Sequence, residues 1–205
     1  MRLEPLGPLT APQIELLEST VGPRDEPPPP FTVWVRSPGL AYWVEGLGAY
    51  CRERSKHPRK LRELSVLIVA RHFDSQSAWN AHYEAAIAEG VPAESLDRLA
   101  RDEDPGFEAD DERVFFRFAQ EMLRQHFVSP STFAEAIELF GEDGMLDLIG
   151  CIGSFSMSAM MINAVELPLR TDLAAPFPDI DGFRHRVDGF RQRVDGFRHR
   201  KEKRA

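Results

Sequence analysis

The sequence predicts an all-α fold, a helical bundle of about six to eight helices. Apolar residues recur at three- and four-residue spacing along most of the chain, and no strand-like alternation is longer than residues 32–35. Helix boundary signals are frequent: Ser129-Pro130 is a typical helix start, and Gly90 and Gly141 follow periodic segments, where glycine often ends a helix. A chain of 205 residues is long enough for one domain with a substantial core and short for two.

The expected helices follow one another along the chain. Serine can cap a helix and proline suits its first turn, so Ser37-Pro38 predicts a helix over 38–53. Its apolar residues follow helical spacing and are Leu40, Trp43, Val44, Leu47 and Tyr50. Further helices are expected over 61–73, 77–89, 92–99, from a cap at Asp110 or Asp111 to 126, over 129–141 and over 143–165.

The chain divides into three regions. Residues 1–30 form an N-terminal arm and proline-rich linker, in which the four prolines 27–30 predict an extended segment. Residues 31–170 form the helical domain. Residues 171–205 form a basic tail with a seven-residue repeat between 181 and 201, whose apolar spacing is that of a coiled coil but whose glycines oppose a helix. A disordered tail is favoured over a helix on an oligomer partner or a nucleic-acid or membrane contact.

Charge and apolar content restrict the partners. The formal net charge is −8, which argues against general nucleic-acid binding because phosphates require clustered Lys and Arg. Residues 145–165 reach the length of a membrane span, but Gly, Ser and Asn dilute them, which favours a buried core or interface helix. The two cysteines, Cys51 and Cys151, form neither a CxxC motif nor a metal-type cluster, so no metal or other cofactor is expected. With no signal-peptide core near Met1, the sequence indicates a reduced, cytoplasmic protein without a membrane partner.

One pair of residues has the chemistry of an active site. Glu63 opens one expected helix, and His82 lies one turn into the next, beside Trp79. If these helices form a hairpin, both side chains can face one cavity. A carboxylate beside an imidazole orients the ring and raises its pKa, which suits proton transfer near neutral pH. By spacing alone, such a pair is more often a surface charge and a structural histidine.

The sequence around this pair resembles the carboxymuconolactone decarboxylase-like family, which includes the alkyl hydroperoxidase D proteins. The helix opens Arg-Glu-Leu at 62–64 and closes Arg-His-Phe at 71–73; Trp-Asn-Ala-His follows at 79–82 and glycine at 90. Segments of 31–40, 111–129 and 141–168 resemble the family's opening, second half and closing helix. The resemblance covers about residues 31–170. It implies the all-α alkyl hydroperoxidase D-like fold, assembly into homo-trimers or hexamers, and a site built from Glu63 and His82.

The resemblance also indicates what this chain lacks. In the peroxidase branch, two cysteines lie twelve and fifteen residues after the glutamate, where this chain has Ser75 and Ala78. Reduction of a peroxide by disulfide exchange needs a thiolate. A glutamate that often stands at the position of Ala78 in cysteine-free relatives is absent too.

Three functional hypotheses remain. The first is a cysteine-independent enzyme of the carboxy-lyase class that uses His82 for proton transfer on a small carboxylated or lactone substrate. Arg71 would anchor the carboxylate, and Ser75, Trp79 and Tyr83 would line the pocket; taken alone, Arg71 suits a salt bridge, Ser75 a helix cap and Trp79 the core. The second hypothesis is a peroxiredoxin-type antioxidant activity. The third is an oligomeric protein that keeps the fold without catalysis.

Overall fold

The computed structural model describes residues 1–21, 26–169 and 175–178, and within these residues it has eight α-helices and no strand. The predicted all-α bundle is therefore confirmed. The 181–201 repeats lie outside the described residues. The elements are α1 (Ala11–Val21), α2 (Phe31–Trp34), α3 (Pro38–Ala49), the π-helical segment η1 (Tyr50–Arg54), α4 (Arg59–His72), α5 (Gln76–Ala88), α6 (Ala93–Ala100), α7 (Asp110–Gln125) and α8 (Pro130–Ala164).

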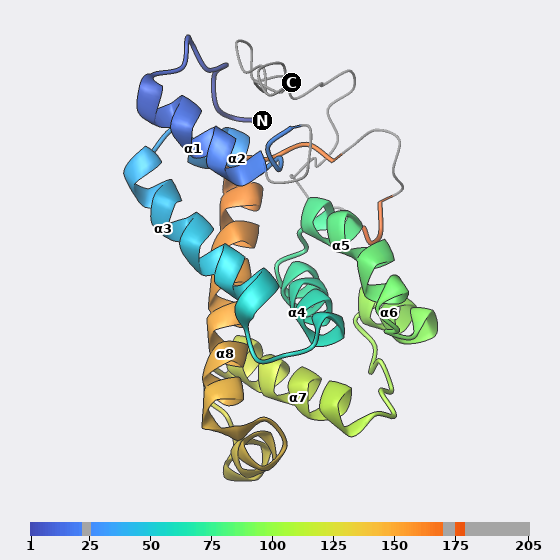
Figure 1. The fold of residues 1–205 in the computed structure, drawn as a ribbon. Helices are drawn as coiled ribbons and strands as arrows, with labels where there is room; N and C mark the ends of the chain where they lie inside the picture. Colours follow the sequence, from blue (N-terminus) through green and yellow to red (C-terminus); the bar gives the residue numbers. More distant parts are fainter. Residues whose placement is uncertain (22–25, 170–174, 179–205) are drawn as a thin grey trace.

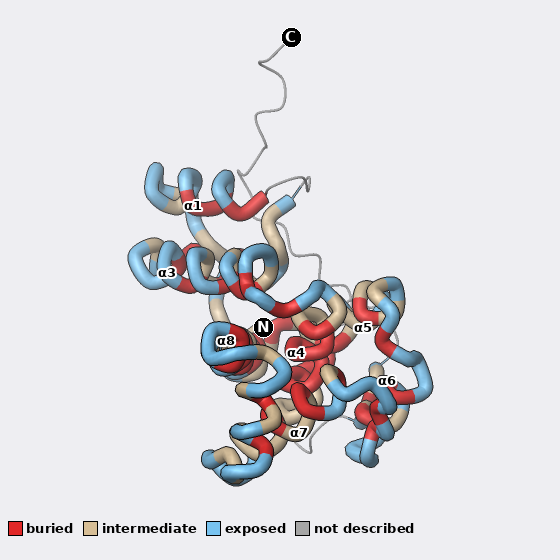
Figure 2. Tube along the Cα trace, turned by 60° about the horizontal axis from the view of Figure 1, so that its bottom comes forward, coloured by how far each residue is buried: buried red, intermediate tan, exposed pale blue. Residues whose placement is uncertain are grey.

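The main core surrounds α4. This helix buries Leu61 and the whole run from Leu64 to Ala70, and Figure 2 shows its central part in the colour of buried chain. It packs against α5, α7 and α8, while α8 runs along the long axis of the molecule (Figure 1). A helix that is apolar around its circumference is expected in the centre of a bundle, because each face then finds a neighbour. The position of α4 therefore follows from its composition.

A second, smaller cluster joins α1, α2 and α3. It consists of Leu16, Leu17, Phe31, Val35 and Ala41. The predicted arm therefore contains a helix that packs on the domain. The prediction that prolines 27–30 are extended was wrong for the last of them, because Pro30 has helical φ and ψ angles of −58° and −28°. The carbonyl oxygens of Pro28 and Pro29 accept hydrogen bonds from the first amides of α2. A φ angle near −65° suits a helical turn as well as an extended one.

The apolar stripe of α3 is only partly buried. Val44 is buried, but Trp43 is 72% exposed, Leu40 is 49% exposed, and Leu47 and Tyr50 are exposed as well. The reason is that α3 packs through its small side, with Ala41 and Gly48 buried. Helical spacing correctly predicted the helix, but it did not identify the face that packs against α1 and α8.

The helix ends only partly follow the predicted caps. Ser129 caps α8 as expected, with its Oγ accepting the Thr132 amide at 3.3 Å. Ser37 occupies the cap position of α3 without a side-chain hydrogen bond. The predicted cap at Asp110 or Asp111 was wrong: Ala109 is the cap residue and the aspartates lie in the first turn of α7. There they still interact favourably with the positive end of the helix dipole.

Glycine ends one helix as expected, and it bends α8 where the sequence predicted two separate helices over 129–141 and 143–165. Gly90 follows α5 with a φ angle of +93°. Gly141, with φ of +70°, bends α8 between its first turns and the long apolar part. Among the described residues, α8 alone has the length and composition to cross a membrane, and half of its most apolar stretch is buried inside the protein. Helices in the core of a globular protein share this property.

Candidate active site

The α4–α5 hairpin places the candidate residues. Asp74, with a φ of +50°, turns the chain after α4, and the Ser75 amide donates back to the Ala70 carbonyl at 2.7 Å. The two helices then pack closely along their length. The beginning of α4 thus lies beside the second half of α5. This arrangement brings together two residues that are nineteen positions apart in the chain.

Glu63 and His82 meet across this hairpin. Nδ1 of His82 lies 2.7 Å from Oε2 of Glu63, and the two side chains are 29% and 15% exposed. Burial alone would raise the pKa of Glu63. The hydrogen bond from His82, with the nearby charges of His82 and Arg59, outweighs burial and lowers that pKa below 4.5. Glu63 is therefore a carboxylate at neutral pH, and it accepts the proton of Nδ1.

This hydrogen bond sets the chemistry of the imidazole. Because a carboxylate can only accept, Nδ1 of His82 carries the proton, and in the neutral ring Nε2 is the basic nitrogen. Nε2 has no hydrogen-bond partner among the described residues. The pair therefore offers one partly exposed nitrogen that can take or give a proton.

Two aromatic residues of α5, Trp79 and Tyr83, lie on either side of His82 in the sequence. Trp79 is only 2% exposed, and its ring stacks on Tyr83 with centroids 6.1 Å apart. The Tyr83 hydroxyl donates to Asp97 at 2.9 Å, and burial together with this carboxylate raises the pKa of Tyr83. Phe177 covers the other side of Trp79 with an edge contact at 5.7 Å. Trp79 is thus part of the core, and Tyr83 is the aromatic side chain nearer the surface.

Arg71 and Ser75 lie at the opposite end of the hairpin. Arg71 is eight residues after Glu63 on α4, about 12 Å along the helix axis at 1.5 Å per residue. Its guanidinium pairs with Asp74, donates to the Ala100 carbonyl at 2.9 Å and lies over the Phe177 ring. Arg71 therefore has the salt bridge that its residue type suggested.

Ser75 takes the cap position of α5 without the side-chain bond expected of a cap. It is fully buried, and its Oγ has no hydrogen-bond partner in the part of the chain that the structure describes. The structure therefore brings Glu63 into contact with His82 and Trp79 into contact with Tyr83, and it places Ser75 near the turn of the hairpin.

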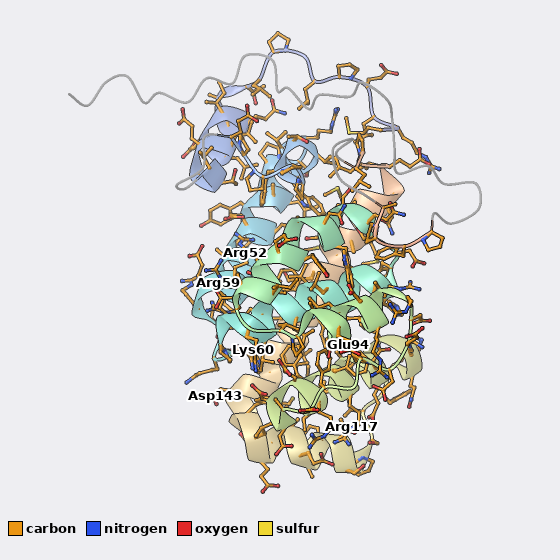
Figure 3. The ribbon with its side chains drawn as sticks, turned by 90° about the vertical axis from the view of Figure 1, so that its right-hand side faces the viewer. Arg52, Arg59, Lys60, Glu94, Arg117 and Asp143 are labelled. Atoms are coloured by element: carbon orange, nitrogen blue, oxygen red, sulfur yellow. The ribbon has the colours of Figure 1, made fainter. Side chains whose placement is uncertain are left out.

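Arg59 is a residue near the pair that the sequence analysis did not select. Its Nε lies 3.7 Å from Oε1 of Glu63, and its Nη1 lies 3.2 Å from Glu89 on α5. Figure 3 labels it on the first turn of α4, and its side chain is 59% exposed. The signal was available, since an arginine four residues before a glutamate faces it on a helix. Arg59 is a cation beside Glu63, whereas the sequence analysis had selected Arg71 as the cation of the site.

Two hollows of the surface lie away from the pair. One, of about 500 Å³, lies between Gly106-Phe107 and α7. The other, of about 280 Å³, lies beside His57, whose Nε2 is 2.8 Å from the Gly144 carbonyl oxygen. Burial lowers the pKa of His57, which is enclosed edge-on by Phe115 and Phe140. Neither hollow is lined by Glu63 or His82.

Comparison with known proteins adds nothing to this geometry. No protein-family model matches the chain, and no curated protein matches it. The case for a function therefore depends on the Glu63–His82 pair and on the residues around it.

Proposed function

We propose that this protein is a cysteine-independent member of the carboxymuconolactone decarboxylase-like family that transfers protons through His82 on a small carboxylated or lactone substrate. The observation that carries the proposal is the 2.7 Å contact between Nδ1 of His82 and Glu63. The contact fixes the tautomer of the ring and leaves Nε2 open. A structural histidine is more often bonded through both nitrogens or enclosed, as His57 is.

The proposed chemistry needs one acid and one anchor. When the bond from carbon to the carboxylate breaks, carbon dioxide leaves and its electron pair forms an enolate. Protonated His82 then donates the proton of Nε2 to the enolate carbon, and the ring returns to its neutral form. Glu63 stabilises the protonated ring, because a buried carboxylate favours a neighbouring cation.

Arg59 is the better anchor for the substrate carboxylate. It lies beside Glu63 and is largely exposed, whereas Arg71 is bound to Asp74 and to a backbone carbonyl. An arginine can bind a carboxylate through two parallel hydrogen bonds. Because Arg59 already contacts Glu63 and Glu89, substrate binding would exchange one of these carboxylates for that of the substrate.

We also propose that the protein acts as a homo-oligomer. The neighbouring helices α3 and α8 expose large apolar side chains, with Trp43 at 72% and Leu146 at 61%. Such surfaces often mark interfaces between proteins. Sedimentation equilibrium is the measurement: the wild type is expected as a trimer or hexamer and Trp43→Glu as a smaller species. A monomeric wild type would contradict the proposal.

The test of the catalytic proposal is an assay of purified protein against small carboxylic acids and carboxylated lactones, followed by release of carbon dioxide. His82→Ala should lower turnover by about 100-fold or more, in line with the loss of a general acid. His72→Ala is the matched control, because His72 is also half-buried at the end of α4 and has no part in the pair. Its turnover should equal that of the wild type.

Two results would overturn the proposal. Equal turnover by His82→Ala and wild type would remove His82 from the chemistry. Failure of every compound to be turned over, or to shift the His82 imidazole resonances in NMR, would indicate an oligomer without catalysis. An added arm with hydrogen peroxide and a thiol reductant, run on Cys51→Ala so that this cysteine cannot react, tests the peroxidase alternative at the positions where Ser75 and Ala78 provide no thiol.

A further inference from the structure

The two cysteines, a hundred residues apart in the chain, meet in the fold. Cys51 lies in η1, and Cys151 lies in the middle of α8, where the end of α3 approaches that helix (Figure 1). The Cys151 thiol donates to the Cys51 carbonyl oxygen at 4.0 Å. Both are free thiols and are buried, with 1% and 0% of their surface exposed. The site is separate from the Glu63–His82 pair.

Polar contacts hold the two cysteines opposite each other. Asp147, four residues before Cys151 on α8, accepts the Tyr50 hydroxyl at 2.7 Å and the Lys56 amide at 2.6 Å. These bonds attach the segment that carries Cys51 to α8 on both sides of the cysteine. The Ser55 hydroxyl also donates to the Cys51 carbonyl oxygen at 3.1 Å. These hydrogen bonds therefore hold η1 against α8 where Cys51 and Cys151 lie close together.

The two sulfurs are chemically unequal. A hydrogen bond from the Cys151 thiol lowers the pKa of Cys51 despite burial, and a hydrogen bond from Ser154 adds to this effect. The same contact and burial raise the pKa of Cys151. Thiolates are the nucleophiles in thiol chemistry. The contact between the two side chains therefore favours the thiolate on Cys51 and the thiol on Cys151.

We propose that Cys51 and Cys151 form a peroxide-sensitive dithiol that closes to an intramolecular disulfide between η1 and α8. The Cys51 sulfur attacks hydrogen peroxide, the O–O bond breaks, and a sulfenic acid and one water form. The Cys151 sulfur then attacks this sulfenic sulfur, the S–O bond breaks, and a second water leaves. Two thiols are oxidised by two electrons in total, and one peroxide is reduced to two waters. A small dithiol reductant reverses the step.

The π-helical segment provides access for the oxidant. A π-helical turn is rare, and such turns occur frequently at functional sites. Cys51 is 1% exposed within this segment, whereas the adjacent Tyr50 is 37% exposed. Local opening of a single turn requires much less free energy than global unfolding. Hydrogen peroxide is small enough to enter through such an opening.

The experiment exposes the reduced full-length protein to hydrogen peroxide at neutral pH and follows its intact mass under non-reducing conditions. The wild type is expected to lose two hydrogens as a monomeric chain, to yield one peptide that links Cys51 with Cys151, and to regain its mass with dithiothreitol. Cys151→Ala should instead gain one oxygen, trapped by a cyclic 1,3-diketone. Cys51→Ala should react with hydrogen peroxide at least about tenfold more slowly than the wild type, because its remaining thiol is the weaker nucleophile.

Controls establish the folding of the variants, the reactivity of accessible thiols and the independence from the Glu63–His82 pair. Helical circular dichroism establishes that each cysteine variant is folded, and the wild type unfolded in guanidinium shows the reactivity of accessible thiols. Glu63→Gln should form the disulfide as the wild type does, so the outcome is independent of the proposed enzymatic function. The proposal is overturned if folded wild type keeps both thiols while the unfolded protein oxidises, or if only links between chains form.

Discussion

Two clusters of reactive side chains are built in opposite ways. Glu63 and His82 are nineteen residues apart, come from two helices of one hairpin and remain partly exposed. Cys51 and Cys151 are a hundred residues apart and buried, and they come from η1 and α8, which contact each other only through the tertiary fold. The first cluster can therefore act on a ligand that arrives from solvent. The second is confined to reaction with a very small molecule and with itself.

Replacement of the aromatic support should produce the largest effect on the exposed cluster. Trp79→Ala is expected to lower the free energy of unfolding by about 3–5 kcal/mol, because it leaves a large cavity in the core. Urea unfolding followed by circular dichroism measures this loss. Tyr83→Phe is the control, since it keeps the stacked ring and removes only the bond to Asp97. A loss below about 1 kcal/mol in Trp79→Ala would mean that the ring lines an open pocket instead.

Oxidation of the buried cluster should stabilise the fold by a somewhat smaller amount. A bond between Cys51 and Cys151 closes a loop of about a hundred residues, and the expected gain in free energy of unfolding is about 2–4 kcal/mol. The comparison is urea unfolding of the oxidised and the reduced wild type. Cys151→Ala treated with peroxide should show no such gain. An oxidised form less stable than the reduced one would mean that the bond strains the junction.

The smallest expected effect is the pH dependence of the Glu63–His82 pair. The pKa of Glu63 is lowered in the folded protein, so its contribution to stability is present above the unfolded pKa of 4.5 and is lost as the pH falls through the folded value. Glu63→Gln should reduce the free energy of unfolding by about 1 kcal/mol at neutral pH and by progressively less in acid. Urea unfolding of both proteins at a series of pH values measures the difference. A constant difference at every pH would exclude this linkage.

The sequence predicted best what depends on neighbouring residues. The α4–α5 hairpin has the expected boundaries within two residues, because apolar spacing, the break at 74–75 and Gly90 are local signals. The Glu63–His82 contact follows from that hairpin. The separation of Arg71 from Glu63 could also have been derived, since eight residues of helix have a known length. The fold class and the exposed cluster were thus predictable in outline.

What depends on tertiary packing was not predictable. Helical spacing marked the stripe of α3 that contains Trp43, but only contact with α1 and α8 decides that Ala41 is buried and Trp43 is exposed. The pairing of Cys51 with Cys151 needs the position of α3 relative to α8. The contact of Phe177 with Trp79 also joins residues far apart in sequence. Such contacts leave no periodic signal in a single chain.

The position of Phe177 affects the order in which the protein is completed on the ribosome. Gln76 at the start of α5 donates to the Phe177 carbonyl oxygen across 101 positions of the chain. Because synthesis proceeds at about 5–20 residues per second, α5 is made roughly 5–20 s before the segment that covers Trp79. Among the described residues, the contact of Phe177 with Trp79 is therefore the last contact of the main core that the growing chain can form.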